Sequence, residues 1–581
     1  MKRTILAGVV ASVICALTGC GGGNGVYQSL AVTPTIVVSP ATANVQQGST
    51  QQFAATVTNS VDNIVTWEVN GMLGGSMLTG TIDVNGVYTA PSVVPTPANV
   101  TVTAVLTAAT NYSANSILTV TSVVFNNSSF QGNYVLGLQG IDAGGAAFYA
   151  VGAITADGNG NIAGGEEDLN DLSSGYTHAS SVTGSYTVGP DGRGTLSLSS
   201  SIGSFSYAIA LRAGNNADLK EMDNAVINAA GSLELQAAGI SAPSGNYAFG
   251  FTGTSSACGA LNSIGIFALS SSSVSGLQDE NCGGTVTQSQ ALTGSYGSAD
   301  AMGRGTGSFS ANTGSPDFVY YVVSANRYRF LCPDKGVLFL GSADVQTQAS
   351  FAASDFNNYY IIATASRSQS TAANALLQID VSGGSIPTGF ADINDTGNFS
   401  SSYLTGAYSL SSNGYITGTL NTTSASLPFS MYLISPSQAY YLDLRTTTSG
   451  GGTAYAQNSS IASEGNLGWA GSYANQQYGS FTAGGTISPG NSISTSGQIS
   501  ANGSGALSGT LDYKDSTGIY PSLQLQGSYS VGLAVLGRAT GKITTSDGTR
   551  NYVYYIVDQH RVEMVETDSS ITALGDAIRQ F

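Results

Sequence analysis

The chain has 581 residues, and Asp, Glu, Lys and Arg make up only 9% of them, well below the roughly 25% of an average soluble protein. Its 34 acidic residues outnumber its 17 basic ones, and the formal net charge of -17 argues against nucleic acid as a partner. A chain of this length with 75 glycines indicates several domains made of short strands and many turns.

The first 19 residues have the layout of a signal peptide. Lys2 and Arg3 precede an apolar run from Ile5 to Leu17, which is too short to remain as a membrane span. The run ends in Leu17-Thr18-Gly19-Cys20, which resembles the lipobox of bacterial lipoproteins. This resemblance implies that the chain is cut after Gly19 and that Cys20 carries the acyl chains, palmitate among them. A general secretory signal with an incidental cysteine is the alternative.

Residues 20–29 form a Gly-rich tether after the predicted cleavage site. Cleavage removes Lys2 and Arg3, so the mature net charge becomes -17 minus 2, or -19. The second mature position is Gly21 rather than an aspartate, which favours the outer membrane. We expect a protein held at the cell outer membrane by the lipid on Cys20. The sequence is compatible with either the periplasmic face or the cell surface.

Residues 30–123 show short alternating strands broken by turn signals. The stretches Val65-Thr66-Trp67-Glu68-Val69 and Gly86-Val87-Tyr88-Thr89-Ala90-Pro91 are similar to bacterial Ig-like domains. The resemblance implies a β-sandwich with Trp67 in its core, and no cysteine pair flanks this tryptophan.

From residue 129 to the end, the sequence repeats with a period of about 110 residues, the size of a whole domain. Each unit opens with an aromatic strand and carries a Gly-x-Tyr marker in its middle. The opening tyrosines are Tyr134, Tyr247, Tyr359 and Tyr473, and the middle ones are Tyr186, Tyr296, Tyr408 and Tyr529. We therefore predict four β repeats at residues 129–241, 242–350, 354–465 and 468–581.

Turn clusters such as Asp157-Gly158-Asn159-Gly160 divide each unit into about eight strands joined by hairpins. Consecutive hairpins predict an up-and-down module, and closure into a barrel removes the exposed sheet edges. In size, aromatic opening and hairpin order the first unit resembles lipocalin-like and streptavidin-like barrels. The predicted fold class is all-β, an Ig-like sandwich followed by four eight-stranded barrels, with sandwiches as the alternative for the repeats.

One acidic motif recurs at equivalent places, a glycine followed three residues later by Asp168, Asp279, Asp392 or Asp512. We favour a structural interpretation, in which an aspartate near a strand end accepts backbone amide hydrogen bonds in an Asx turn. The alternative is a cation or polar-ligand site at a barrel rim, because carboxylate oxygens are the ligands of hard cations. Its densest oxygen supply would be Glu166, Glu167, Asp168 and Asp171.

Five cysteines are present, of which Cys15 leaves with the signal and Cys20 is assigned to lipid. Strand parity puts Cys258 and Cys282 at one end of the second module, which favours a structural disulfide in an oxidising compartment. A pairing that involves Cys332 is the alternative. No CxxC occurs, and His178 and His560 lie in different units, so we expect neither a metal site nor a cofactor.

No catalytic constellation can be placed, because the two histidines lack a Ser or Cys nucleophile motif and no phosphate-binding loop occurs. Our leading hypothesis is a non-enzymatic, lipid-anchored cell-envelope protein with a binding, adhesion or scaffolding role toward a glycan or protein partner. Its 30 tyrosines suit recognition surfaces.

The alternative is a carrier of small apolar ligands inside lipocalin-like barrels. Inward-pointing large side chains would fill the barrels and argue against it, and Tyr320, Tyr321, Phe330 and Phe339 are the residues to inspect. A distant alternative is a glycan-active enzyme that uses paired carboxylates.

Overall fold

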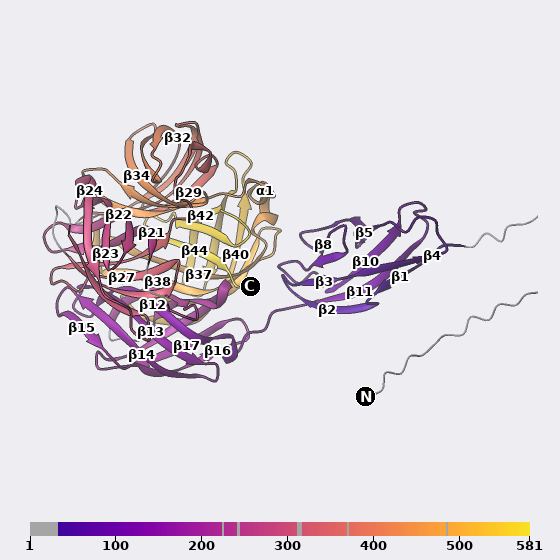
Figure 1. The fold of residues 1–581 in the computed structure, drawn as a ribbon, viewed down its shortest axis with the longest axis horizontal. Helices are drawn as coiled ribbons and strands as arrows, with labels where there is room; N and C mark the ends of the chain where they lie inside the picture. The colour runs from indigo at the N-terminus through magenta and orange to yellow at the C-terminus, as the bar shows by residue number, and fades with distance from the viewer. Residues whose placement is uncertain (1–32, 224–225, 241–243, 311–315, 369–370, 484–485) are drawn as a thin grey trace, which may run out of the picture.

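The computed structural model describes residues 33–223, 226–240, 244–310, 316–368, 371–483 and 486–581. The predicted signal peptide, Cys20 and most of the segment before the first strand lie outside these residues. In Figure 1 a smaller N-terminal part stands beside four barrels, which follow one another through the colour gradient.

Three small sheets in the N-terminal part enclose one apolar core. β1 (Thr35–Ser39) pairs with β4 (Ala54–Thr58). The second sheet has the order β2 (Thr42–Gln46), β11 (Ser113–Thr121), β10 (Asn99–Leu106), β5 (Val65–Val69), β6 (Met72–Leu73), and the third has the order β3 (Thr50–Gln52), β9 (Val87–Thr89), β8 (Gly80–Ile82), β7 (Gly75–Ser76). Trp67 packs in the core with Phe53, Tyr88 and Val102. Membership of the Ig-like family stays a prediction.

The four repeats are four closed, antiparallel barrels, which confirms the predicted barrels over sandwiches. Barrel 1 contains β12 (Gln131–Asp142), β13 (Ala147–Asp157), β14 (Asn161–Asp171), β15 (Gly175–Ala179), β16 (Thr183–Val188), β17 (Arg193–Ser199), β18 (Ser204–Arg212), β19 (Asn216–Glu221) and β20 (Val226–Leu235). Barrel 2 contains β21 (Gly245–Ser255), β22 (Gly259–Ser270), β23 (Ser273–Cys282), β24 (Thr285–Tyr296), β25 (Arg304–Ser310), β26 (Asp317–Ser324), β27 (Arg327–Leu331) and β28 (Val337–Val345).

Barrel 3 contains β29 (Tyr359–Arg367), β30 (Ala372–Ser382), β31 (Ser385–Asp395), β32 (Asn398–Leu410), β33 (Tyr415–Asn421), β34 (Ser426–Ser435), β35 (Gln438–Asp443) and β36 (Ser449–Ala456). Barrel 4 contains β37 (Gly471–Ala483), β38 (Thr486–Ala501), β39 (Ala506–Lys514), β40 (Ile519–Val531), β41 (Arg538–Thr545), β42 (Gly548–Ile556), β43 (Arg561–Glu566) and β44 (Ile571–Arg579).

Each barrel is an up-and-down meander in which the last strand pairs with the first. Barrel 1 differs in one respect, because its fourth strand is broken into β15 and β16. We refer below to the strands of every barrel as strands 1 to 8, with β15 and β16 together as strand 4 of barrel 1.

The aromatic markers close one end of the barrels. Short helical turns precede barrels 1 and 3, η1 (Asn127–Ser129) and η3 (Ala353–Asp355), and each is followed by a buried phenylalanine. Phe130 stacks on Tyr134 at 4.2 Å between ring centroids and meets Tyr186 edge-on, and Phe356 contacts Tyr360 and Tyr408 in the same way. The opening tyrosine of the third unit is therefore Tyr360 rather than Tyr359, a shift of one residue from the sequence alignment.

Side chains fill the lumen of barrel 2. Tyr320, Phe330 and Phe339 point inward and join Phe249, Phe251, Phe267 and Phe309 in one cluster, while Tyr321 points outward toward barrel 1. The void that remains among these rings has a volume of about 10 Å³, whereas small-molecule sites have volumes of roughly 300–1,000 Å³. Barrel 2 therefore has no room for an enclosed ligand.

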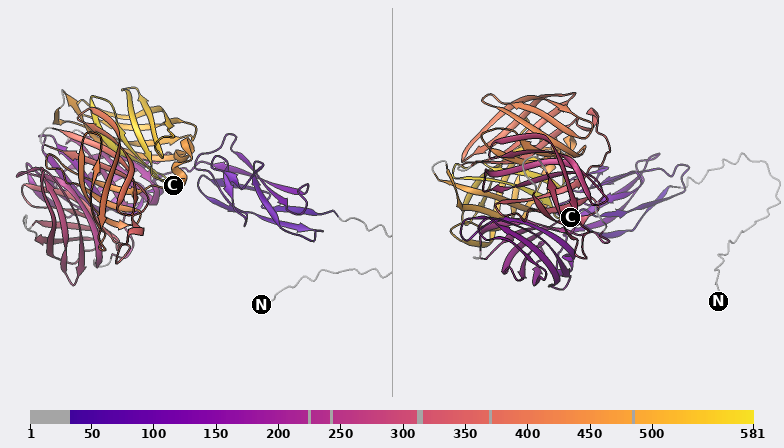
Figure 2. Two further views of the ribbon diagram at one scale, coloured as in Figure 1. Left: turned by 90° about the horizontal axis from the view of Figure 1, so that it is seen from above. Right: turned by 60° about the vertical axis from the view of Figure 1, so that its left-hand side comes forward.

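The four barrels form a closed ring (Figures 1 and 2). Strands 1 to 3 of barrels 1, 2 and 3 pack against strands 6 to 8 of the barrel that follows. The same pairing recurs between the chain's last and first barrels, because β37 and β38 of barrel 4 contact β18, β19 and β20 of barrel 1. The ring thus has four equivalent interfaces and an approximate fourfold symmetry.

Apolar residues cover three of these interfaces. Val135 and Val151 of barrel 1 meet Val319 and Leu331 of barrel 2, and similar clusters join barrels 2 and 3 and barrels 3 and 4. The interface that closes the ring is more polar: Lys220 donates to Ser494 Oγ at 2.7 Å, and Gln476 Nε2 donates to the carbonyls of Leu219 and Gly231 at 3.0 and 2.8 Å.

Removal of one ring from the filled lumen tests how far barrel 2 depends on it. Phe251→Ala deletes a side chain that stacks on Phe339 and Phe249, so we expect a loss of about 3–5 kcal/mol in the free energy of unfolding. Urea denaturation of the full chain measures it. Leu533→Ala, at a fully exposed position, is the control and should stay within about 0.5 kcal/mol of the parent. Equal effects of the two substitutions would contradict a tightly filled lumen.

Candidate functional site

The recurring aspartates lie at the interfaces between barrels. Asp168, Asp279 and Asp392 stand on strand 3 of their barrels and are fully buried, and Asp512 is nearly so. Three of them receive an arginine from strand 5 of the next barrel in the ring. Arg304 donates to Asp168 at 2.8 and 2.9 Å, Arg538 to Asp392 at 2.7 Å twice, and Arg193 of barrel 1 to Asp512 of barrel 4 at 2.7 Å.

Asp279 has a tyrosine where the other three aspartates have arginine. Tyr415 donates its hydroxyl to Asp279 at 3.0 Å, and the backbone N–H of Ser289 donates at 2.7 Å. Burial raises the pKa of Asp279, and these hydrogen bonds only partly offset it. Burial also acts on Asp168, but hydrogen bonds from Arg304, Tyr176 and Tyr321 outweigh it and hold the pKa of that carboxyl below its usual value. Arg304 therefore contributes to holding Asp168 ionised, whereas Asp279 has no arginine to offset the effect of its burial.

An asparagine two residues after the aspartate adds a second contact in the first three barrels. Asn170 Nδ2 donates to the carbonyls of Cys332 and Asp334 at 2.7 and 3.0 Å. Asn281 reaches the carbonyls of Asp443 and Arg445, and Asn394 those of Glu566 and Ile571. All these acceptors follow or end strand 7 of the next barrel. Lys514 takes this place in barrel 4 and contacts Glu221 of barrel 1.

A glutamine directly after strand 8 supplies the third contact, and it recurs in all four barrels. Gln236, Gln346, Gln457 and Gln580 each donate from Nε2 to two backbone carbonyls of the next barrel at 2.7–3.2 Å. One acceptor precedes a glycine with positive φ, such as Gly303 at +90°, where a Cβ would lie 2.6 Å from Gln236 Nε2. The residue after this glycine is the arginine or tyrosine that binds the aspartate.

The structure separates the four carboxylates of the predicted rim site. Neighbouring strand residues point to opposite faces, so Glu166 and Asp168 face barrel 2, while Glu167 lies on the other face and accepts from Ser200 at 2.5 Å. The Asx turn expected at Asp168 is made by Asp171 instead, since Asp171 Oδ1 accepts from the backbone N–H of Ser173 and Ser174, whereas Asp168 binds Arg304 and Tyr321 of barrel 2. Glu166, Glu167, Asp168 and Asp171 therefore do not form one binding site.

Glu166 and its neighbours are the most acidic part of the interface between barrels 1 and 2. Glu166 Oε1 is buried without a hydrogen-bond partner, and His178 lies 3.1 Å from Asp168 and 4.0 Å from Glu166. Burial and the nearby carboxylate of Asp300 raise the pKa of Glu166 to about 7, although Arg304 acts in the opposite direction.

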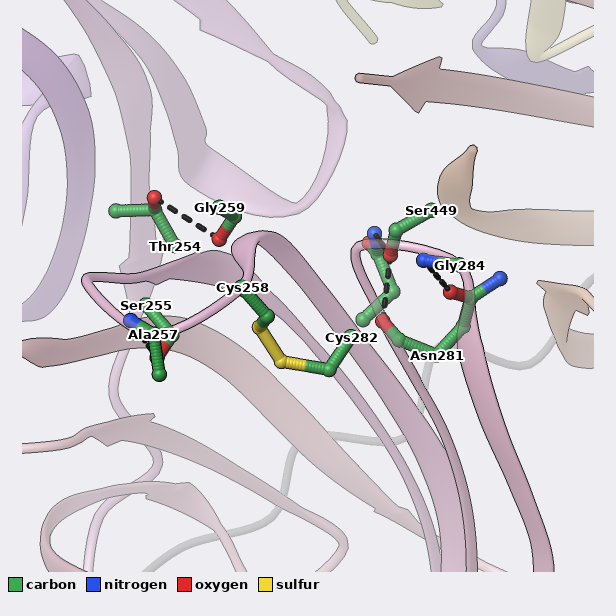
Figure 3. Close-up of a disulfide and its surroundings, with 10 residues drawn as sticks. Thr254, Ser255, Ala257, Cys258, Gly259, Asn281, Cys282, Gly284 and Ser449 are labelled. Carbon is green, nitrogen blue, oxygen red and sulfur yellow. Dashed lines mark hydrogen bonds between the residues drawn. A yellow bond between two sulfur atoms is a disulfide. The ribbon is translucent and has the colours of Figure 1, made fainter. Parts of the chain in front are cut away.

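Cys258 and Cys282 are joined in a disulfide, with their Cα atoms 5.6 Å apart. The bond ties the turn between β21 and β22 to the end of β23, next to Asn281 (Figure 3). Ser449 of barrel 3 donates to the carbonyl of Asn281 at 2.6 Å, so the disulfide braces a strand end that contacts the next barrel. Cys332 is a buried, unpaired thiol in the lumen of barrel 2.

Open grooves lie at equivalent places on the outer faces of barrels 1 and 3. The first, with a volume of about 420 Å³, is lined by strands 4 to 6 of barrel 1, and the second, of about 520 Å³, by strands 4 and 5 of barrel 3. Small side chains line both: Gly184, Ser185, Ser197 and Ser199 in one, and Thr405, Gly406, Ala407 and Thr419 in the other. Cross-strand hydroxyl pairs such as Thr187 and Thr195, 2.8 Å apart, continue this surface.

In the part of the chain that the structure describes, no group of three or more His, Cys, Asp and Glu side chains is arranged to hold a metal ion. Within the same residues, no helix has the length and apolar character needed to cross a membrane.

Comparison with known proteins gives little further help. No protein-family model matches the chain, and no curated protein matches it. Among solved structures, the isotype 1 transferrin binding protein B of Neisseria meningitidis serogroup B is 10% identical, with 64% of this chain and 83% of that chain covered and a TM-score of 0.18. Intact Ap-TbpB, with its N and C lobes, is also 10% identical, with 62% of this chain and 83% of that chain covered and a TM-score of 0.18. A TM-score this low supports no inference about fold or function.

Loss of one inter-barrel arginine should weaken the ring strongly. Arg538→Met leaves the fully buried Asp392 without its ionic partner, and breaking such a pair from one side costs about 3–5 kcal/mol. Urea unfolding of the full chain measures this loss. The double variant Arg538→Met, Asp392→Asn should regain most of it, because no unpaired charge stays buried. A loss below about 1 kcal/mol in the single variant would show that the pair is dispensable.

Glu166 should make stability depend on pH near neutrality. Its folded-state pKa of about 7 lies above the ordinary value of 4.5, so the protonated side chain stabilises the fold at low pH and this contribution is lost as pH rises toward and beyond 7. Between pH 5 and 8 the parent should lose on the order of 2 kcal/mol relative to Glu166→Gln. Parallel pH profiles of the two proteins in urea unfolding would refute the assignment.

Proposed function

We propose that this chain is a non-enzymatic, lipid-anchored protein of the cell envelope that presents its barrel ring to a binding partner. The observation that supports the proposal is which barrel surfaces are buried between barrels and which stay exposed. Strands 1 to 3 and 6 to 8 make the main contacts with neighbouring barrels, and aromatic side chains fill the lumen of barrel 2. Strand 5 touches the neighbouring barrel at its first residue, through Arg193, Arg304, Tyr415 or Arg538. The outer faces of strands 4 and 5 beyond that end are the broad sheet surfaces left for a partner.

The chemistry of these faces favours an uncharged partner. Exposed positions on strands 4 and 5 of barrel 1 are Thr183, Ser185, Thr187, Thr195, Ser197 and Ser199. Hydroxyl groups both donate and accept hydrogen bonds, and they complement the hydroxyls of a neutral glycan or the polar backbone of a protein segment. A strongly charged partner finds few ionic contacts on such a surface.

Repetition of the surface supports binding through avidity. The grooves lie on barrels 1 and 3, which are separated by one barrel on either side of the ring. Two weak sites held at a fixed distance bind a repetitive partner more tightly than either site alone. The lipid on Cys20 and the N-terminal sheets would hold this ring away from the membrane.

The filled lumen of barrel 2 gives the carrier hypothesis no support, so we do not propose a carried ligand for that barrel. We also propose no glycan-cleaving activity, because the acidic residues of the recurring motif serve as partners of arginine, tyrosine and backbone groups across the interfaces.

Attachment of cells that carry the full chain tests the proposal. Ser197→Arg and Thr419→Arg place a long charged side chain in the groove of barrel 1 and of barrel 3, respectively. We expect each single variant to reduce attachment to a biotic surface partly, and the double variant to reduce it to the level of cells lacking the protein. Microscopic counts of retained cells measure the effect.

Two controls accompany this assay. Ser308→Arg changes the corresponding position of barrel 2, which lies outside the two grooves described above, and should leave attachment unchanged. Cys20→Ser should release the protein from the membrane fraction and abolish attachment. Unchanged attachment of cells lacking the whole protein would reject adhesion, and detergent sensitivity of the same cells would then favour a scaffolding role.

A further inference from the structure

One position at the end of strand 7 carries a buried side chain that points into the lumen of each barrel. The four residues are Glu221, Cys332, Asp443 and Glu566, all at most 2% exposed. They alternate with lumen residues of the same strands, as Glu566 does with Val562 and Met564. Three of the four barrels thus contain a carboxylate that is withdrawn from water.

Two of these carboxylates receive a cation from the chain itself. Glu221 is bound by Lys514, which barrel 4 extends across the ring-closing interface and whose Nζ also donates to the carbonyl of Asp223. Asp443 is bound by Arg445, two residues further on, at 2.6 Å. These pairs are expected, because a buried carboxylate without a compensating partner costs several kcal/mol.

Glu566 has neither partner. Both of its carboxylate oxygens are buried and make no hydrogen bond within the described residues. The position of Arg445 is taken by Asp568, a second acid, and the position of Lys514 is taken by Asn394, whose amide donates to the carbonyl of Glu566 instead. Barrel 4 therefore keeps the acidic pair that barrel 1 has in Glu221 and Asp223 but lacks its lysine.

Barrel 4 also contains buried oxygen atoms that make no hydrogen bond within the described residues. Asn475 Oδ1 and Thr495 Oγ1 are buried and unpartnered in the same barrel. Thr495 stands directly opposite Gln477 in the β37–β38 register. Asn475 Nδ2 lies 3.2 Å from the Sδ atom of Met564, which precedes Glu566 by two residues on β43. Arg550 acts electrostatically on Glu566, but it makes its ion pair with Asp547, at 2.9 Å, and stacks on Tyr513 at 4.3 Å.

Barrel 4 also has smaller side chains at this level than barrel 2. Phe251 and Phe339, which stack at 4.8 Å in barrel 2, correspond to Gln477 and Ala573 when the two barrels are aligned on Tyr247 and Tyr473 and on Gln346 and Gln580. The next inward position of strand 8 is Gly575, paired with Gln477. Compared with barrel 2, the lumen of barrel 4 therefore has smaller and more polar side chains near Glu566, the carboxylate that makes no hydrogen bond.

We propose that barrel 4 binds a divalent hard cation at Glu566, in the place that the Lys514 ammonium occupies in barrel 1. Glu566 and Asp568, whose carboxylate also accepts from the backbone and side-chain amides of Asn551 at 2.9 and 2.7 Å, together match the charge of a divalent ion. The amide oxygen of Asn475 and the hydroxyl of Thr495 are neutral oxygens of the kind that Ca²⁺ accepts.

Thermal unfolding of the full mature chain with Ca²⁺ as the probe tests the proposal. We expect millimolar CaCl2 to raise Tm by about 2–4 °C over EDTA, and calorimetric titration to find one site. Glu566→Gln should abolish both effects, and in EDTA it should unfold at a higher temperature than the parent because no buried charge remains. MgCl2, and NaCl at matched ionic strength, distinguish a divalent site from general screening.

Asn394→Lys is the decisive second variant, because it gives barrel 4 the lysine of barrel 1. It should raise Tm in EDTA and remove the response to Ca²⁺. Asp317→Asn, at an exposed carboxylate of barrel 2, is the matched control and should respond to Ca²⁺ as the parent does. A parent Tm that is independent of Ca²⁺, or an equal response in the parent and Glu566→Gln, would overturn the proposal, and either result would leave the attachment assay unaffected.

Discussion

The pairing of a buried aspartate on one barrel with an arginine on the next is the interaction on which the ring depends. A carboxylate at a protein interface must be matched or it destabilises the assembly, so Asp168, Asp392 and Asp512 stabilise only the arrangement that brings Arg304, Arg538 and Arg193 to them. The apolar clusters supply contact area, but they do not specify how one barrel is rotated against the next. The ion pair, the asparagine and the glutamine together fix how far each barrel turns against its neighbour.

Approximate symmetry makes the departures informative. Tyr415 replaces arginine at one interface, and the carboxylate it serves has a raised pKa. Barrel 1 has a broken fourth strand where the others have one long strand. Glu566 lacks the directly bonded cation that Glu221 and Asp443 have. When equivalent positions in three barrels carry the same type of residue, that residue shows what packing of the barrels requires. A residue that departs from the other three at an energetic cost therefore points to a function of its own barrel.

The sequence predicted the four barrels because hairpin signals and aromatic markers are local and recur. It could not predict the interfaces, since the partner of Asp168 lies 136 residues away in another repeat and alternation along one strand does not reveal which face meets another barrel. That is why Asp168 was interpreted as a turn residue while Asp171 makes the turn. The sequence did contain a signal for these interfaces. Glutamines recur 110, 111 and 123 residues apart at the same place in each repeat, at Gln236, Gln346, Gln457 and Gln580. Three glycine–arginine pairs follow a similar spacing.

Gln580, the penultimate residue, makes to barrel 1 the contact that the glutamines between barrels make to their successors. The ring therefore has no structural beginning, because the contact between barrels 4 and 1 repeats the contacts between consecutive barrels. A gene rearranged to start at any of the four barrels would encode the same set of interfaces.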